Sequence, residues 1–316
     1  MMRKLQYILT CVLIMTSLCA CEYKDFIEDE GDTVSFNVDF DWQNVDSIPS
    51  SMRVVFYPDD AETMAKMTQG YRIFDVQNKI TEVFLPTGNY KAIAFNNDTE
   101  HLTTEDYGMY GLLYASTINY ESRGIYDKPN VIDSIYDFQD IRDYPDYMVQ
   151  GSQSFSLNLA DYDKVLTFTP DSIVTTVNIT FNGIGGLSWV RDIRGAIDLT
   201  MNKRFLNRDE LEEPAVNMFN CEYNDSLVTA KFYVFGMEQS ILQYQHKLTL
   251  FFWMNQGKVF VPMTLDSERI TFYSEEPHRI SIGVQMDLDL RDFFAERNGF
   301  EIEVDEWEDI SIDVGF

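Results

Sequence analysis

Residues 279–290 read RISIGVQMDLDL and show the most regular alternation in the chain. Apolar side chains take every second position and polar or small ones take the positions between: Ile280, Ile282, Val284, Met286, Leu288 and Leu290 are the apolar set. Successive side chains of a β-strand point to opposite faces, so a period of two predicts a strand with one buried face.

The same period recurs along most of the chain. It predicts a first strand at 33–42, where Val34, Phe36, Val38, Phe40 and Trp42 are the apolar members. Further strands are expected at 52–56, 71–76, 80–85, 90–95, 155–159, 177–181, 197–201, 227–236, 246–255 and 258–265. Gln256-Gly257 is a candidate hairpin turn between the last two.

Helical signals are few. Asp59 and Asp60 precede Met64 and Met67, which predicts one or two helical turns with an Asp as N-cap. Residues 291–298 form a candidate helix ended by Gly299, and the charged stretch 203–214 is expected to be a loop.

Many short strands separated by turns predict an all-β protein of two tandem antiparallel β-sandwich domains. The length of 316 residues suits two such domains, which we place at 33–165 and 166–316.

Residues 97–148 interrupt the alternation. They hold eight of the 18 tyrosines, namely 107, 110, 114, 120, 126, 136, 144 and 147, together with Pro129 and Pro145. The segment is either a functional insertion or a set of short strands that the pattern does not separate. Its tyrosines either form a platform for adhesion or glycan stacking or cover the edges of a sandwich.

The N-terminus carries an export signal. Arg3 and Lys4 precede an apolar run that is too short to span a bilayer. Leu18-Cys19-Ala20-Cys21 resembles the lipobox of bacterial lipoproteins, which implies that residues 1–20 are a signal peptide and that Cys21 is the lipid attachment site. The alternative is an ordinary cleaved signal that ends near a Cys. Residues 21–32 follow as an acidic tether, similar to the export tags of surface-exposed lipoproteins, so we expect a lipid-anchored protein exposed on the outer membrane.

Charge and cysteine content narrow the function classes. The formal net charge is −28, and removal of residues 1–20 takes it to −30, because Arg3 and Lys4 are the only charges lost. Nucleic acids and anionic lipids attract positive charge, so neither is an expected partner. In the mature chain Cys221 is the remaining thiol besides Cys21, and we expect it to be buried and inert.

No constellation of residues indicates catalysis. His101, His246 and His278 are not at metal-ligand spacing, and the stretch at Gly183 lacks the Lys of a P-loop. Paired carboxylates are expected by chance among 52 acidic residues. Asp39, Asp41, Asn44 and Asp46 lack the Gly and closing Glu of a calcium loop. We therefore expect no enzyme activity, no cofactor and no metal site.

Several motifs, taken with the lipobox, resemble the fimbrillin-associated lipoproteins of anaerobic Gram-negative bacteria: Asp39-Phe40-Asp41-Trp42, Leu85-Pro86-Thr87-Gly88-Asn89-Tyr90, Asn96-Asn97-Asp98-Thr99-Glu100 and Val304-Asp305-Glu306-Trp307-Glu308. The resemblance implies two transthyretin-like or fimbrillin-like sandwiches and a role at the base or tip of a surface fibre. It also implies that subunits join by strand addition, which needs an open sheet edge. The candidate strands are 33–42 and the tail 300–316, and the alternative for each is an ordinary paired strand.

The first functional hypothesis is thus a non-catalytic surface lipoprotein involved in fimbria (pilus) anchoring, assembly or adhesion. Its partners would be the outer membrane, fimbrial subunits and a host or bacterial surface ligand. The alternative is a glycan-binding lipoprotein of a polysaccharide-uptake system, with the aromatic residues of 97–148 as its platform. A hydrolase ranks last, because no residues support one.

Overall fold

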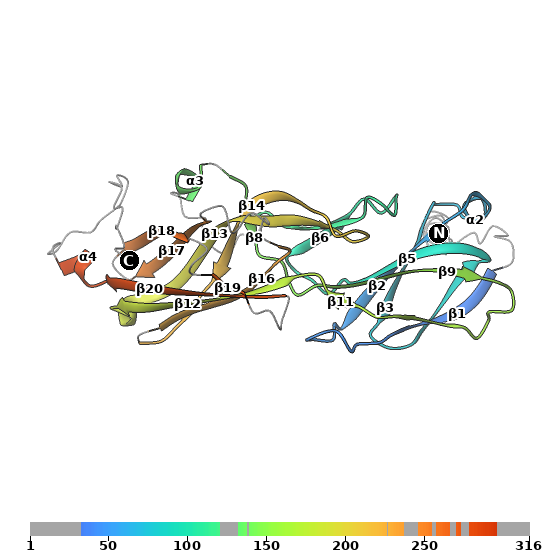
Figure 1. Ribbon diagram of the computed structural model, residues 1–316, viewed down its shortest axis with the longest axis horizontal. Helices are drawn as coiled ribbons and strands as arrows, with labels where there is room; N and C mark the ends of the chain where they lie inside the picture. The colour runs from blue at the N-terminus through green and yellow to red at the C-terminus, as the bar shows by residue number, and fades with distance from the viewer. Residues whose placement is uncertain are drawn as a thin grey trace, which may run out of the picture.

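The structure is a computed structural model that describes residues 33–120, 132–137, 139–225, 227–236, 246–254, 257–265, 270–272 and 278–295. Two β-sandwiches lie end to end along the long axis of the molecule (Figure 1). The all-β, tandem-sandwich prediction is confirmed. None of the helices in the described part of the chain is long and apolar enough to cross a membrane.

The first sandwich packs a three-stranded sheet on a five-stranded one. The small sheet has the order β10 (Val165–Phe168), β1 (Thr33–Phe40), β4 (Thr81–Pro86). The larger has the order β11 (Asp171–Ser172), β9 (Val149–Leu157), β5 (Gly88–Asn96), β2 (Ser51–Pro58), β3 (Arg72–Gln77). The alternating apolar residues of β1 are buried against those of β2 and β5, which makes this core.

A short helix closes the outer end of the first sandwich. α2 (Ala61–Ala65) begins after Asp60, whose side chain accepts a hydrogen bond from the backbone N–H of Thr63 at 2.7 Å. The predicted Asp N-cap is confirmed. The Thr63 hydroxyl in turn accepts from the backbone N–H of Asn89 at 2.9 Å, which joins the helix to the start of β5.

The second sandwich packs a five-stranded sheet on a larger one. The first sheet has the order β15 (Glu222–Tyr223), β16 (Leu227–Val234), β12 (Thr175–Gly185), β20 (Arg279–Asp289), β19 (Ile270–Phe272). The second has the order β18 (Gly257–Leu265), β17 (His246–Met254), β13 (Val190–Phe205), β14 (Leu211–Asn220), β8 (Ile141–Asp143), and β7 (Tyr114–Thr117) joins it to β6 (Leu102–Glu105). β20, the strand predicted from 279–290, lies beside β12 in the middle of its sheet.

Short helical turns lie outside these sheets: η2 (Leu187–Trp189) follows β12, α3 (Ile132–Ile135) precedes β8, and α4 (Asp292–Ala295) follows β20. α4 falls within the helix expected at 291–298, whereas Gly299 lies outside the described residues, as do Gln256 of the expected hairpin and the tail 300–316. β17 and β18 do pair as an antiparallel hairpin, with Met254 opposite Gly257.

The segment 97–148 resolves into short strands that belong to the second sandwich. β7 pairs with the end of β13, and β8 pairs with β14. The side chain of Tyr136, after α3, is fully buried, and its hydroxyl donates to the carbonyl of Ala196 at 2.6 Å. The described part of the insertion therefore packs on the second sandwich, whereas Tyr126 and Pro129 lie outside the described residues.

Because β9, β10 and β11 return to the first sandwich, the two domains are interleaved in sequence. The chain passes between them at 97–101, 144–148 and 173–174. The expected boundary between residues 165 and 166 falls inside β10, which pairs with β1. Strand pairing assigns the residues up to Ser172 to the first sandwich, with the exception of 102–143, which belong to the second.

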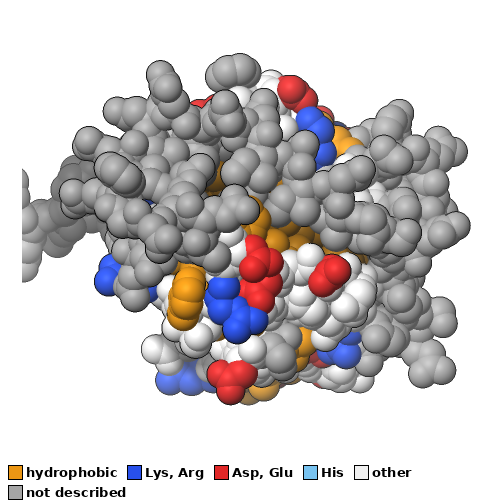
Figure 2. Space-filling view, turned by 90° about the vertical axis from the view of Figure 1, so that its left-hand side faces the viewer, with side chains coloured by type: hydrophobic (Ala, Val, Ile, Leu, Met, Phe, Trp, Pro, Cys, Tyr) orange, Lys and Arg blue, Asp and Glu red, His pale blue; other side chains and the backbone are white. Residues whose placement is uncertain are grey.

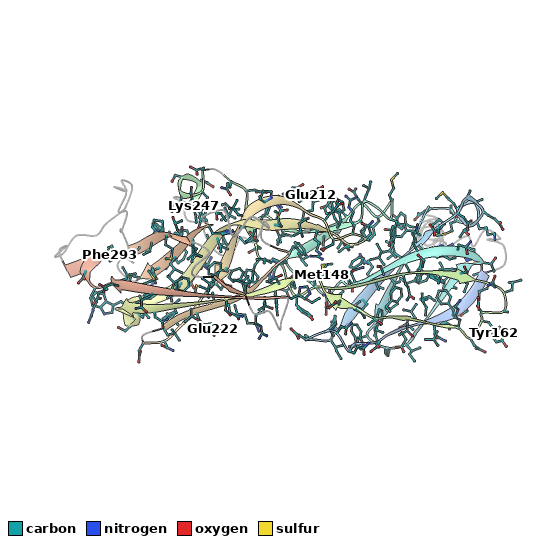
Figure 3. All side chains as sticks on the ribbon, in the orientation of Figure 1. Met148, Tyr162, Glu212, Glu222, Lys247 and Phe293 are labelled. Atoms are coloured by element: carbon teal, nitrogen blue, oxygen red, sulfur yellow. The ribbon has the colours of Figure 1, made fainter. Side chains whose placement is uncertain are left out.

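A shared apolar cluster joins the two sandwiches. Its buried members come from the outer face of the β2–β5 pair, from the β6–β7 hairpin and from the second domain: Val55, Tyr57, Ile93, Phe95, Leu113, Ala115, Met148, Ile173, Val174, Leu206 and Phe235. Met148 lies at the junction in Figure 3. We call this set the junction cluster. Burial of this many large side chains favours one rigid body over two mobile domains.

The loop expected at 203–214 is shorter than predicted: only 206–210 connects two strands without regular structure. β13 continues to Phe205 and β14 begins at Leu211, with Lys203 directly opposite Glu212. The Lys203 ammonium lies 3.3 Å from the Glu212 carboxylate. This charge that suggested a loop is therefore neutralised across the two strands.

Candidate functional site

The first strand was one of the two candidates for strand addition, and it is not an open edge along its whole length. β1 lies between β4 and β10. However, β4 pairs with residues 33–38, whereas β10 begins only opposite Asn37. Within the described residues, no strand pairs with Val34–Phe36 on the β10 side. Half of one edge of β1 thus has no partner strand among the described residues.

The backbone at this half-edge points toward the gap. The N–H of Asn37 donates to the carbonyl of Lys164, and that of Asp41 donates to Phe168, each at 2.8 Å, so the odd-numbered residues of β1 direct their peptide groups toward β10. Ser35 has the same parity, and its N–H and C=O therefore face the same side, before β10 begins. Such a pair of groups is the template that strand addition uses.

The floor of the gap is apolar. Phe155 on β9 faces the sandwich interior, where its ring lies 5.8 Å from Phe36 and stacks on Tyr90 at 5.5 Å. Phe155 is nevertheless only partly buried, whereas Phe36 and Tyr90 are fully buried. We call the unpaired backbone edge at Val34–Phe36, next to Val165 and Phe155, the β1 slot.

The opposite side of this sandwich is closed by aromatic side chains. β3 and β4 are the edge strands there, and the rings of Phe74 and Phe84 meet edge to face at 5.6 Å between the two sheets. Phe84 is 50% exposed, so this side presents an apolar edge but no gap in the core.

In the second domain the long edge strand β18 is protected. It carries Lys258 and Pro262, and a charge or a proline at an edge discourages pairing with another chain. The β1 slot is therefore the better template for a partner strand.

Two of the tyrosines considered either as a glycan platform or as a cover for the sandwich edges pack within the protein. Tyr107 and Tyr110 of the insertion cover β2 and β3, where Tyr110 meets Tyr57 at 5.5 Å and Tyr107 stacks on Tyr71 at 6.4 Å. Arg53 lies over the Tyr107 ring at 5.9 Å. Burial raises the pKa of the Tyr57 hydroxyl. The faces of these rings are used within the protein, which favours the covering role over the platform.

A small cavity lies under the insertion. Its volume is about 40 Å³, and it is lined by Tyr120, Asp143, Tyr144, Arg194, Met218, Phe219 and Asn220. The Arg194 guanidinium donates to the Asp192 carboxylate at 3.0 Å and to the Tyr120 hydroxyl, and it lies 5.1 Å from the centre of the Trp253 ring. A cavity of this size holds water and not a sugar, so we assign it a packing role.

The remaining candidate residues show no catalytic arrangement in the described part of the chain. Burial raises the pKa of the Cys221 thiol, which keeps it protonated and unreactive. His246 is buried with Nδ1 3.1 Å from the Asp198 carbonyl oxygen, and His101 pairs with Asp146 at 2.6 Å. Among the described residues, no group of three or more His, Cys, Asp or Glu could hold a metal ion. Cys21, residues 1–20 and 21–32, and the tail 300–316 lie outside the described residues.

Sequence reasoning selected β1 but not the parts that make the slot. Ser35 and Phe155 were each assigned to a strand, yet which edge lacks a partner depends on where β10 begins, 130 residues away in sequence. The only local signal was the short length of the apolar stretch at 165–168, Val165-Leu166-Thr167-Phe168.

Comparisons with known proteins support this fold. A family model described as "Domain of unknown function (DUF5119)" matches residues 20–219. Among proteins with curated descriptions, none matches the chain in sequence. A crystal structure of a candidate adhesin from Bacteroides ovatus ATCC 8483 superposes with a TM-score of 0.57 at 17% identity, over 85% of this chain and 97% of that one.

Two further solved structures are more distant. Candidate polysaccharide-binding proteins from Bacteroides thetaiotaomicron VPI-5482 give a TM-score of 0.48 at 12% identity, over 81% of this chain and 92% of theirs. The fimbrial anchor protein Mfa2 of Porphyromonas gingivalis gives 0.46 at 13% identity, over 80% of this chain and 90% of that one.

Proposed function

The chain belongs to the family of domains of unknown function DUF5119, and we propose that it is a non-catalytic cell-surface lipoprotein that acts in adhesion and in the anchoring or assembly of fimbriae. Three observations support the proposal: the lipobox-like Leu18-Cys19-Ala20-Cys21, a fold shared with a candidate adhesin of Bacteroides ovatus, and the β1 slot. The slot carries the most weight, because it gives a physical means of joining a partner.

The lipid anchor is attached at Cys21. A single acyl chain binds membranes only marginally, whereas the two or more chains of a bacterial lipoprotein anchor the protein stably. Residues 21–32 then act as the tether between the outer membrane and β1.

A partner strand enters the β1 slot beside Val34–Phe36. Its backbone pairs with the N–H and C=O of Ser35, and its alternate side chains cover Phe155 and continue the core above β10. Fimbrial subunits are the expected source of the strand, because the sequence resembles fimbrillin-associated lipoproteins, which implies that subunits join by strand addition.

Two proline substitutions test the slot against the other edge of the same sheet. Ser35→Pro removes an N–H that faces the slot, and Phe84→Pro on β4 is the matched control. Phe84 lies opposite Ser35 in the antiparallel pair, so its N–H faces the outer edge of β4. Neither change removes a hydrogen bond between β1 and β4, and edge positions tolerate proline.

The measurement is a pulldown of the full-length protein from its own outer membrane, with mass spectrometry of the proteins that accompany it. We expect wild type and Phe84→Pro to bring down fimbrial subunits and Ser35→Pro to lose them at least tenfold. If Phe84→Pro loses the fimbrial subunits and Ser35→Pro retains them, the partner strand binds at β4 and not at the β1 slot. Recovery of a glycan transporter without fibre subunits would contradict the fimbrial role.

A further inference from the structure

One end of the molecule carries exposed apolar side chains on well-ordered turns. Met64 on α2 is 51% exposed, and Leu159 and Tyr162, in the loop between β9 and β10, are 59% and 68% exposed. Tyr162 lies at the outer end of the first sandwich in Figure 3, on the same side as α2 in Figure 1. We call these three residues the tip.

Hydrogen bonds hold the tip in place. In the loop that bears Leu159 and Tyr162, the backbone N–H of Asn158 donates to the Asp161 carboxylate at 2.7 Å, and the Lys164 ammonium donates to the Ser156 carbonyl at 2.7 Å. The side chain of Asn89 links this loop to the helix, because it lies 2.6 Å from the Ser156 hydroxyl and donates to Asp60 at 2.7 Å. The apolar side chains are therefore presented by a fixed surface.

The chain enters the structure at this same end. Leu157 at the end of β9 lies opposite Gly88, and Pro86 lies opposite Thr33. Strand pairing thus places the start of β1 next to the tip. Residues 21–32 precede it and reach at most about 40 Å when fully extended, or roughly 20 Å as a flexible coil.

We propose that the tip rests on the lipid surface in which Cys21 is anchored, with Leu159, Tyr162 and Met64 at the level of the headgroups. This rests on the lipid attachment proposed above. The tether keeps the tip within reach of the membrane, and Tyr and Leu are side chains that partition into the interface between headgroups and acyl chains. With its tip on the membrane, the molecule extends along its long axis away from the lipid surface, and the second sandwich is the part farthest from it.

The contact is apolar and not electrostatic. Carboxylates surround the tip, among them Asp60, Glu62 and Asp163, so an anionic lipid surface repels it. At the opposite end of the molecule, the described atoms in Figure 2 show acidic and basic side chains beside hydrophobic ones. Exposed apolar side chains also occur elsewhere, such as Trp189 at 40%, so what distinguishes the tip is that β1 starts beside it.

The test uses the full-length acylated protein in phosphatidylcholine vesicles with brominated acyl chains. In a Cys221→Ala background, Tyr162→Cys is labelled with bimane, and Tyr223→Cys in the second sandwich, 38% exposed, is the control position. Bromine quenches a fluorophore that it contacts. We expect at least a twofold loss of fluorescence for the label at 162 and none for the label at 223.

The outcomes separate this proposal from the anchor on which it rests. If mass spectrometry finds Cys21 acylated and the label at 162 is not quenched, the tip is not on the membrane although the anchor stands. An unacylated Cys21 overturns both. Phosphatidylglycerol should reduce the quenching at 162, and an increase would contradict an apolar contact.

Discussion

At the scale of single residues, the second core depends on a glycine that the sequence pattern does not single out. Gly195 lies in the middle of β13, and a Cβ atom added there would come within 2.0 Å of the Phe219 ring. That ring stacks on Phe232 at 4.3 Å, between the two sheets. The missing side chain is what allows the two rings to fill this part of the core.

Gly195→Ala should therefore destabilise the protein by about 1–3 kcal/mol, the usual cost of overpacking a core. Gly283→Ala is the matched control, because Gly283 is an exposed strand glycine with no atom within 4 Å of an added Cβ. The control should be neutral or gain about 0.5–1 kcal/mol. Urea unfolding of the two variants measures the difference, and equal midpoints would contradict this account of the core.

At the scale of elements, periodicity predicted the strands but not their partners. β1 and β20 follow directly from their alternating apolar residues, since one buried face is a local property of the sequence. β14 was missed because its charged start pairs with β13, and such pairing is visible only when both strands are placed. The sheet to which β6, β7 and β8 belong could not be predicted either, because it depends on contacts between residues far apart in sequence.

The candidate site shows the same limit. The sequence selected β1 for strand addition, and its apolar alternation was a sufficient reason. The opening itself arises from the short length of β10 and its late start opposite Asn37. No property of residues 33–42 alone could have shown which half of the strand lacks a neighbour.

Besides the strand pairs of β7 and β8, a buried hydroxyl at the end of α3 holds the insertion on the second sandwich. Besides its bond to Ala196, the Tyr136 hydroxyl lies 3.0 Å from the Thr249 hydroxyl, which can donate to it, and burial raises the pKa of Tyr136. Tyr136→Phe leaves the Ala196 carbonyl without this donor and the Thr249 hydroxyl without this partner, and should cost about 1–3 kcal/mol.

In this variant, protection from hydrogen exchange should fall first at the backbone amides of Tyr136 and Gln139. These amides donate to the carbonyls of Ile132 and Tyr136, respectively. Tyr162→Phe serves as the control and should change stability by less than about 0.5 kcal/mol, since its side chain is exposed. If the two variants behave alike, Tyr136 does not hold the insertion.

At the scale of the whole molecule, the interleaved chain and the junction cluster make the two sandwiches interdependent. The first sandwich cannot be completed until the chain has passed through the second and returned as β9. A strand partner in the β1 slot would therefore be joined mechanically to both domains and, through residues 21–32, to the lipid proposed at Cys21.

We expect the protein to unfold in a single calorimetric transition, with equal calorimetric and van 't Hoff enthalpies. Phe235→Ala removes a fully buried ring from the junction cluster and should cost about 3–5 kcal/mol. A wild-type protein that unfolds in two separate steps would contradict the interdependence of the sandwiches.

We propose that the β1 slot receives a strand from another polypeptide. The most direct measurement places a photo-crosslinking amino acid at Ser35 and, as a control, at exposed Lys231 on β16, in cells that display the protein. We predict a crosslink from position 35 to an alternating apolar segment of another polypeptide, identified by mass spectrometry, and none from position 231. A crosslink from position 35 only to this chain's own residues would mean that the slot is filled from within, and the account of partner binding would be wrong.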